Sequence, residues 1–204
     1  KRLQRRFERA LALIRLGFYE WAKWELYEIE RRTQDSKQLR KLMRAYEQTE
    51  SFHRSSYIAQ IRFYSERHDK KIQGARDLWE LAYPKAYQPM VEYYSKQFNI
   101  PTQLIWAIMR AESRYKHDIR SPVGATGLMQ LMPNTGRQVS RLLGDGGFRP
   151  QSLEVPEVNI RLGSRYLTRL GKKFKFQIPL MAAGYNAGPH RVESWLANFG
   201  NLDM

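Results

Sequence analysis

Residues 101–133 read PTQLIWAIMRAESRYKHDIRSPVGATGLMQLMP, and the rest of the chain is organised around this stretch. It begins with four apolar residues at the spacing of one helical face, Leu104, Ile105, Ile108 and Met109. Four residues after Ile108, the same stripe reaches Glu112. Burial and the partial negative charge at the end of a helix both raise the pKa of a carboxyl group. Glu112 can therefore stay protonated near neutral pH, as a general acid requires.

A more ordinary interpretation of Glu112 is also open. Helix-end glutamates commonly pair with basic neighbours on a solvated face, here Arg110, Arg114 or Lys116. The residues that follow favour the catalytic interpretation. Residues 121–127, SPVGATG, form a turn sequence with two glycines able to adopt positive φ, and they lead into the apolar run LMQLM. Gln130 is an amide within that run, although an exposed face of a short helix is the commoner place for a glutamine.

A second candidate segment is residues 178–188, which predict a tightly packed helix ending at Asn186, Ala187 and Gly188. A tyrosine at the end of such a helix, here Tyr185, can direct its hydroxyl into a cleft. The alternative is that Tyr185 only packs in the core and that Asn186 takes the left-handed conformation of a helix end.

Three segments now stand in order, AES at 111–113, SPVGATGLMQLMP at 121–133 and GYNAG at 184–188. They resemble the three successive motifs of the soluble lytic transglycosylases, whose catalytic domain shares its fold with goose-type lysozymes. The order, the spacing and the length of the middle motif argue against chance. The resemblance covers roughly residues 83–201, and it departs from the family at Gly184, where an alanine is more usual.

The resemblance implies cleavage of the MurNAc-GlcNAc β-1,4 bond of peptidoglycan, with 1,6-anhydromuramyl products and a periplasmic location. Most glycosidases use two carboxylates, whereas here Glu112 is expected to act alone, first as acid and then as base, assisted by the N-acetyl group of the substrate. The residues expected to orient the sugar or line the site are Ser121, Gln130, Met132, Tyr185 and Asn186.

Composition limits the possible partners without choosing among them. The 204 residues carry 35 Lys and Arg against 20 Asp and Glu, a formal net charge of +15, which attracts any polyanion. No nucleic-acid motif is present, so we expect no nucleic-acid partner. The resemblance implies peptidoglycan glycan strands as the partner. The absence of cysteine excludes disulfides. No apolar run has the length of a membrane span, and the start at Lys1 predicts a processed or excised piece.

The pattern predicts an all-α chain with two domains. Residues 1–76 are expected to form an α-superhelix of stacked helix pairs, and residues 77–204 a lysozyme-like catalytic domain. We expect the clustered Trp21 and Trp24 to pack between helices, and the polar segment 67–76 to form the junction. Since the family continues past the point matching Gly200 with a further helical segment, the catalytic domain is expected to be truncated at its C-terminal end.

The helix expected after Pro156 carries an arginine every fourth residue, Arg161, Arg165 and Arg169. Such a row is most often a solvated face, and the alternative is contact with carboxylates of a polymeric substrate. His117 and His190 have no zinc-like spacing, and Ser113 and Ser121 lack a His and Asp partnership, so we expect neither a metal or other cofactor nor a nucleophilic triad. Two further functions stay open: a goose-lysozyme-like hydrolase with the same acid, and a basic binding module without catalysis.

Overall fold

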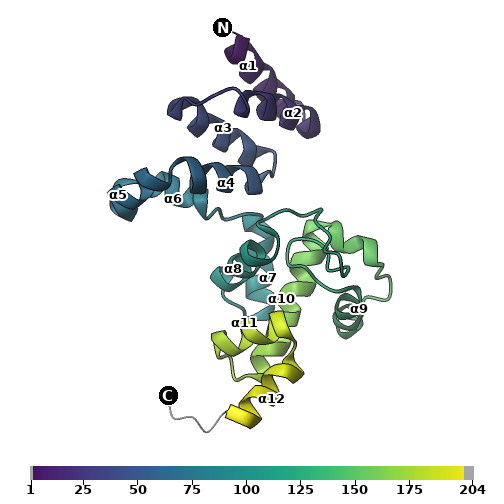
Figure 1. The fold of residues 1–204 in the computed structure, drawn as a ribbon. Coiled ribbons are helices and arrows are strands. Elements are labelled where there is room, and N and C mark those ends of the chain that lie inside the picture. Colours follow the sequence, from purple (N-terminus) through teal and green to yellow (C-terminus); the bar gives the residue numbers. More distant parts are fainter. Residues whose placement is uncertain (1, 200–204) are drawn as a thin grey trace. The chain divides into compact units, whose positions relative to one another are not determined.

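A computed structural model describes residues 2–199 of the chain. Within this part, the regular structure consists of twelve α-helices and one 3-10 helix, with two isolated β-bridges and no strand (Figure 1). The prediction of an all-α chain is confirmed. The chain divides into two compact units, Lys1–Tyr87 and a second that begins at Gln88. None of the helices in the described part is long and apolar enough to cross a membrane.

The first unit is a series of helices in which neighbours along the chain pack together. Its helices are α1 (Arg2–Arg15), α2 (Tyr19–Glu30), α3 (Ser36–Gln48), α4 (Phe52–Arg62), α5 (Tyr64–Gly74) and α6 (Arg76–Ala82). The apolar stripe of α1 packs on a core that includes Leu26 of α2 and Leu42 of α3. The side chain of Asp35 caps α3 by accepting a hydrogen bond from the backbone N–H of Gln38 at 2.8 Å. Stacked helix pairs in residues 1–76 are therefore present as expected.

One detail of this unit differs from the sequence expectation. Trp21 and Trp24 are each 71% exposed, so they do not pack between helices of the described chain. The helix that starts at Phe52 ends at Arg62 and buries Ser55, Ser56, Ile58 and Ala59. Small side chains allow closer helix packing, and the hydroxyl of Ser56 donates a hydrogen bond to the Ala82 carbonyl oxygen at 2.9 Å.

The polar segment 67–76 is mostly helical. It belongs to α5, which is interrupted where Lys71 adopts a φ of 54°. Arg67 is buried, donates a hydrogen bond to the Ala59 carbonyl oxygen at 3.1 Å and stacks over the ring of Trp79 at 4.7 Å. These contacts hold α5 and α6 against α4, within the compact unit that ends at Tyr87. The domain boundary expected at residue 76 stays a prediction.

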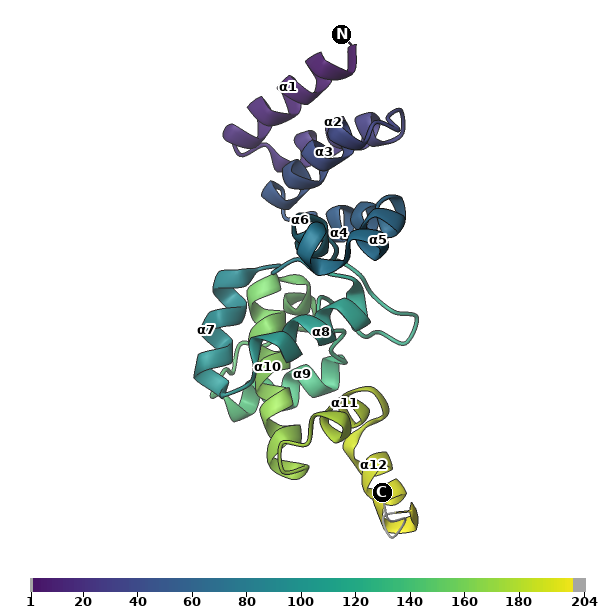
Figure 2. The same cartoon turned by 90° about the vertical axis from the view of Figure 1, so that its left-hand side faces the viewer.

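The second unit is built around one long helix. Its elements are α7 (Gln88–Phe98), α8 (Thr102–Ser113), α9 (Pro133–Leu142), η1 (Pro150–Glu154), α10 (Pro156–Lys173), α11 (Ile178–Ala187) and α12 (Pro189–Phe199). The central α10 packs against α7, α9, η1 and α11, as the two views in Figures 1 and 2 show. A small core beside the site contains Leu131, Val139, Leu153 and Leu162, with Tyr166 and Tyr185 packed against it.

Candidate active site

Glu112 lies in the last turn of α8, and the chain leaves that helix sharply. Arg114 and Tyr115 both adopt left-handed conformations, with φ of 51° and 66°. The apolar face of α8 is buried through Met109, so the carboxyl group follows directly on a buried stripe, as the sequence predicts. The glutamate itself is half-buried.

The environment of Glu112 favours its protonated form. Burial raises the pKa of this carboxyl group above its usual value. None of the ion pairs formed within residues 2–199 involves Glu112, so pairing with Arg110, Arg114 or Lys116 is not observed. A desolvated carboxyl group without a cationic partner has the properties of a general acid.

Tyr185 interacts with both the acid and the second motif. Its ring packs edge-on against Tyr166 of α10, with 5.4 Å between ring centroids, and its hydroxyl donates a hydrogen bond to the Met129 carbonyl oxygen at 2.7 Å. Burial and then the negative charge of Glu112 raise the pKa of Tyr185 well above its usual value. Tyr185 is therefore a neutral phenol that interacts electrostatically with Glu112.

The loop between α8 and α9 carries the second motif and is closed by its own hydrogen bonds. The Ser121 N–H donates a hydrogen bond to the Ala125 carbonyl oxygen, and the Ala125 N–H donates one to the Ser121 hydroxyl. Thr126 forms isolated β-bridges with Arg120 and Leu131. Gln130 adopts a φ of 47°, and its amide nitrogen donates to the carbonyl oxygens of Ile119 and Gly127 at 3.1 and 3.0 Å. In this structure Gln130 therefore stabilises the loop rather than lying on a helix face.

Asn159 of α10 is hydrogen-bonded to the same loop. This residue was not identified from the sequence. Its fully buried amide accepts a hydrogen bond from the Met129 N–H at 2.8 Å and donates to the carbonyl oxygens of Thr126 and Leu153 at 2.9 and 2.7 Å. The signal was available, because Asn159 precedes Gly163 and Leu167 at four-residue steps on the buried face of α10. An asparagine on such a face requires polar partners.

Gly127 explains how the loop comes so close to α10. It adopts a φ of +81°, and a Cβ placed there would lie 2.2 Å from both the Asn159 amide nitrogen and the Leu153 carbonyl oxygen. Only glycine fits this position, both for its backbone conformation and for its contacts.

The predicted site residues are placed as follows. Tyr185 interacts electrostatically with Glu112 and is hydrogen-bonded to Met129, whereas Gln130 bonds within its own loop. Met132 is 41% exposed immediately before α9, and Asn186 is exposed near the end of α11, where Gly188 rather than Asn186 takes the positive φ. No hydrogen bond or ion pair within the described residues joins Ser121, Met132 or Asn186 to Glu112, so their role in binding stays a prediction. Within residues 2–199, no three His, Cys, Asp or Glu side chains are grouped to hold a metal ion.

The sequence of the chain matches a known family model and several named relatives. A family model described as the transglycosylase SLT domain matches residues 89–204. The soluble lytic murein transglycosylase of Escherichia coli strain K12 is 36% identical over 153 residues, which cover 72% of this chain and 24% of that protein. The protein of the same name from Salmonella typhimurium is 35% identical over 153 residues, with the same coverage. The chain spans about a quarter of the length of these relatives.

Solved structures show the same likeness over nearly the whole chain. An inactive mutant of the lytic transglycosylase Slt from Pseudomonas aeruginosa has a TM-score of 0.60 and 33% identity, covering 95% of this chain and 30% of that one. The soluble lytic transglycosylase SLT70 from Escherichia coli has a TM-score of 0.60 and 26% identity, covering 97% of this chain and 40% of that one.

Proposed function

Because this chain belongs to the transglycosylase SLT domain family, we propose that it carries the catalytic acid of a lytic transglycosylase acting on peptidoglycan. The bond cleaved is the β-1,4 link between MurNAc and GlcNAc, and the product ends in 1,6-anhydromuramic acid. The cell-wall substrate implies a periplasmic location in the whole protein.

The first step uses the proton of Glu112. The carboxyl group protonates the glycosidic oxygen as the bond from that oxygen to C1 of MurNAc breaks, so GlcNAc leaves with a free hydroxyl. The carbonyl oxygen of the MurNAc N-acetyl group stabilises the positive charge that develops at C1. This assistance from the substrate replaces the second carboxylate of most glycosidases.

The second step returns the proton. Glu112, now a carboxylate, takes the proton of the C6 hydroxyl of the same sugar, and that oxygen forms the new bond to C1. The acid is restored and no water is consumed. The bond between C1 and the glycosidic oxygen has been replaced by a bond between C1 and the C6 oxygen. Tyr185, held by Met129, remains a neutral phenol beside the carboxylate and orients the sugar.

One observation carries the proposal: Glu112 is half-buried, has a raised pKa, forms no ion pair with any described residue, and acts electrostatically on Tyr185. A carboxylate on a solvated face would be neither half-buried nor raised in pKa by burial. The proposal also rests on the names of the relatives, which describe murein transglycosylases.

The test is digestion of purified sacculi followed by mass spectrometry of the released muropeptides. We expect anhydro products, which are one water lighter than reducing ends, and a loss of about 10³-fold or more in rate for Glu112→Gln. The matched control is Glu154→Gln, which alters an exposed glutamate of the same unit and should retain the full rate.

Two results would contradict the proposal. Reducing ends in place of anhydro ends would show a hydrolase of the goose-lysozyme type. Undiminished cleavage by Glu112→Gln would show that another group supplies the proton.

A further inference from the structure

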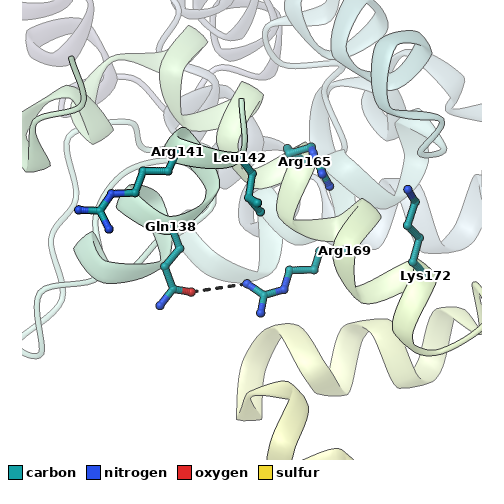
Figure 3. A pocket seen from close by; sticks show the side chains of 6 residues that line it. All are labelled: Gln138, Arg141, Leu142, Arg165, Arg169 and Lys172. Atoms are coloured by element: carbon teal, nitrogen blue, oxygen red, sulfur yellow. Dashed lines mark hydrogen bonds between the residues drawn. The ribbon is translucent and has the colours of Figure 1, made fainter. Parts of the chain in front are cut away.

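A basic groove lies between α9 and α10 of the second unit. It has a volume of about 580 Å³, and Figure 3 shows the side chains that line it: Gln138, Arg141, Leu142, Arg165, Arg169 and Lys172. Four of these six residues are cationic, and none is acidic. We refer to this site as the basic groove.

The positive charges of the basic groove are not neutralised by ion pairs with described residues. No ion pair within residues 2–199 includes any of its four cations. The contrast with adjacent residues is sharp, because Arg161, one turn before Arg165, pairs with Asp145 at 2.5 Å, and Lys173 pairs with Glu193 at 2.5 Å. The basic residues of α10 are therefore of two kinds, paired ones outside the groove and unpaired ones within it.

The geometry of the groove suits a carboxylate-bearing ligand. Arg169 donates a long hydrogen bond of 3.5 Å to the Gln138 side chain, which brings α9 and α10 together across the groove. Arg165 is half-buried, so its charge is less screened than that of an exposed arginine. Guanidinium groups bind carboxylates through two parallel hydrogen bonds, and the apolar side chain of Leu142 adds a surface for a short aliphatic segment.

The position of the groove indicates which carboxylates reach it. Gln138 lies six residues after Met132, about 9 Å along the helix at 1.5 Å per residue. Arg165 directly precedes Tyr166, whose ring packs against Tyr185. The small core that contains Tyr185 also includes residues of α9 and α10, so the groove lies on the two helices that support the candidate active site.

We propose that the basic groove binds the free carboxylates of the peptides attached to the peptidoglycan strand whose glycan is held at Glu112. This inference rests on the proposed function for the identity of the polymer. It assigns Arg165, Arg169 and Lys172 to substrate recognition and gives them no role in the bond-breaking step.

The experiment measures equilibrium binding of a fluorescent disaccharide-peptide by anisotropy, on the whole 204-residue chain carrying Glu112→Gln so that the probe is not consumed. The comparison probe has the same structure with its carboxylates converted to amides. We expect Arg169→Gln with Lys172→Gln to weaken binding of the acidic probe about tenfold and to leave the amidated probe unchanged. Arg165→Gln with Arg169→Gln should weaken it at least as much.

The matched control is Arg5→Gln with Arg15→Gln, which removes the same net charge from exposed, unpaired positions of the first unit and should not alter binding. Thermal melting shows whether each variant is folded; Lys172 and Arg169 are both exposed, so their pair remains informative even if the half-buried Arg165 is needed for stability.

Two outcomes would overturn the inference: unchanged binding of the acidic probe, or equal weakening with both probes. Binding does not depend on turnover. An absence of anhydro products with carboxylate-selective binding intact would therefore refute the proposed reaction and leave the groove assignment standing.

Discussion

The hydroxyl of Tyr185 donates a hydrogen bond to the backbone carbonyl oxygen of Met129, with 2.7 Å between the two oxygens. This bond joins the end of α11 to the loop before α9, two segments 56 residues apart in sequence. The same tyrosine senses the charge of Glu112 at the end of α8. One side chain thus relates all three motif segments, by a hydrogen bond to the loop that Asn159 supports and by electrostatic interaction with the acid.

Removal of the Tyr185 hydroxyl tests this connection. Tyr185→Phe should lower the free energy of unfolding by about 1 kcal/mol, since one hydrogen bond is lost and the Met129 oxygen loses its partner. We expect cleavage of sacculi to slow by about tenfold, because the sugar loses a positioned phenol. Denaturant unfolding and initial rates measure both effects. Tyr166→Phe, which keeps the ring contact with Tyr185 and leaves the bond to Met129 intact, serves as the control. An equal effect there would show that the hydrogen bond of Tyr185 is not the cause.

The raised pKa of Glu112 predicts a pH dependence of stability. A carboxyl group whose pKa is higher in the folded state than in the unfolded state contributes stability that is fully present below the unfolded pKa, near 4.3 for glutamate. That contribution is lost as the pH rises through the folded pKa. The neutral side chain of Glu112→Gln has no such dependence. The melting temperature of the variant minus that of the parent should therefore increase with pH above about 4.

Thermal melts from pH 4 to 8 measure this difference, and Glu154→Gln supplies the baseline for an exposed glutamate. A melting-temperature difference that stays constant over this range, or that falls as the pH rises, would mean that Glu112 is not desolvated in the folded chain.

Asn159 should be among the most sensitive positions of the second unit. Asn159→Ala removes three hydrogen bonds and leaves a buried N–H and two buried carbonyl oxygens without that partner, so we expect a loss of about 3 kcal/mol or more in unfolding free energy. Denaturant unfolding measures the loss. Asn134→Ala, at an exposed position in the first turn of α9, should change stability by about 0.5 kcal/mol or less. Similar losses at both positions would argue against the role assigned to Asn159.

A comparison of Gly127 with Gly124 distinguishes backbone strain from steric overlap as costs of adding a methyl group. Both adopt positive φ, but a Cβ at Gly124 meets nothing within 4 Å, whereas one at Gly127 overlaps Asn159 and the Leu153 backbone. Gly124→Ala should cost about 1 kcal/mol for the backbone conformation alone. Gly127→Ala should cost about 3 kcal/mol, since overpacking is added to the same strain. Equal costs, measured by denaturant unfolding, would mean that the loop moves freely away from α10.

The sequence by itself determined the elements that depend on local order. Apolar periodicity and proline positions gave the helices, the stripe through Met109 placed Glu112 on a partly buried face, and the three motifs identified the family. These features follow from residues close together in the chain, where 3.6-residue periodicity and backbone preferences act directly.

Tertiary structure alone decided which polar groups meet. The Gln130 amide is used by its own loop, Asn159 reaches that loop from 30 residues away, and the unpaired cations of α9 and α10 converge on one groove while Arg161 is neutralised by Asp145. Sequence spacing does not encode these contacts, because hydrogen bonds and ion pairs between distant segments depend on how the helices pack. Tertiary structure also decided which apolar residues are buried: Leu42 is fully buried in the first unit, whereas Trp21 and Trp24 are exposed.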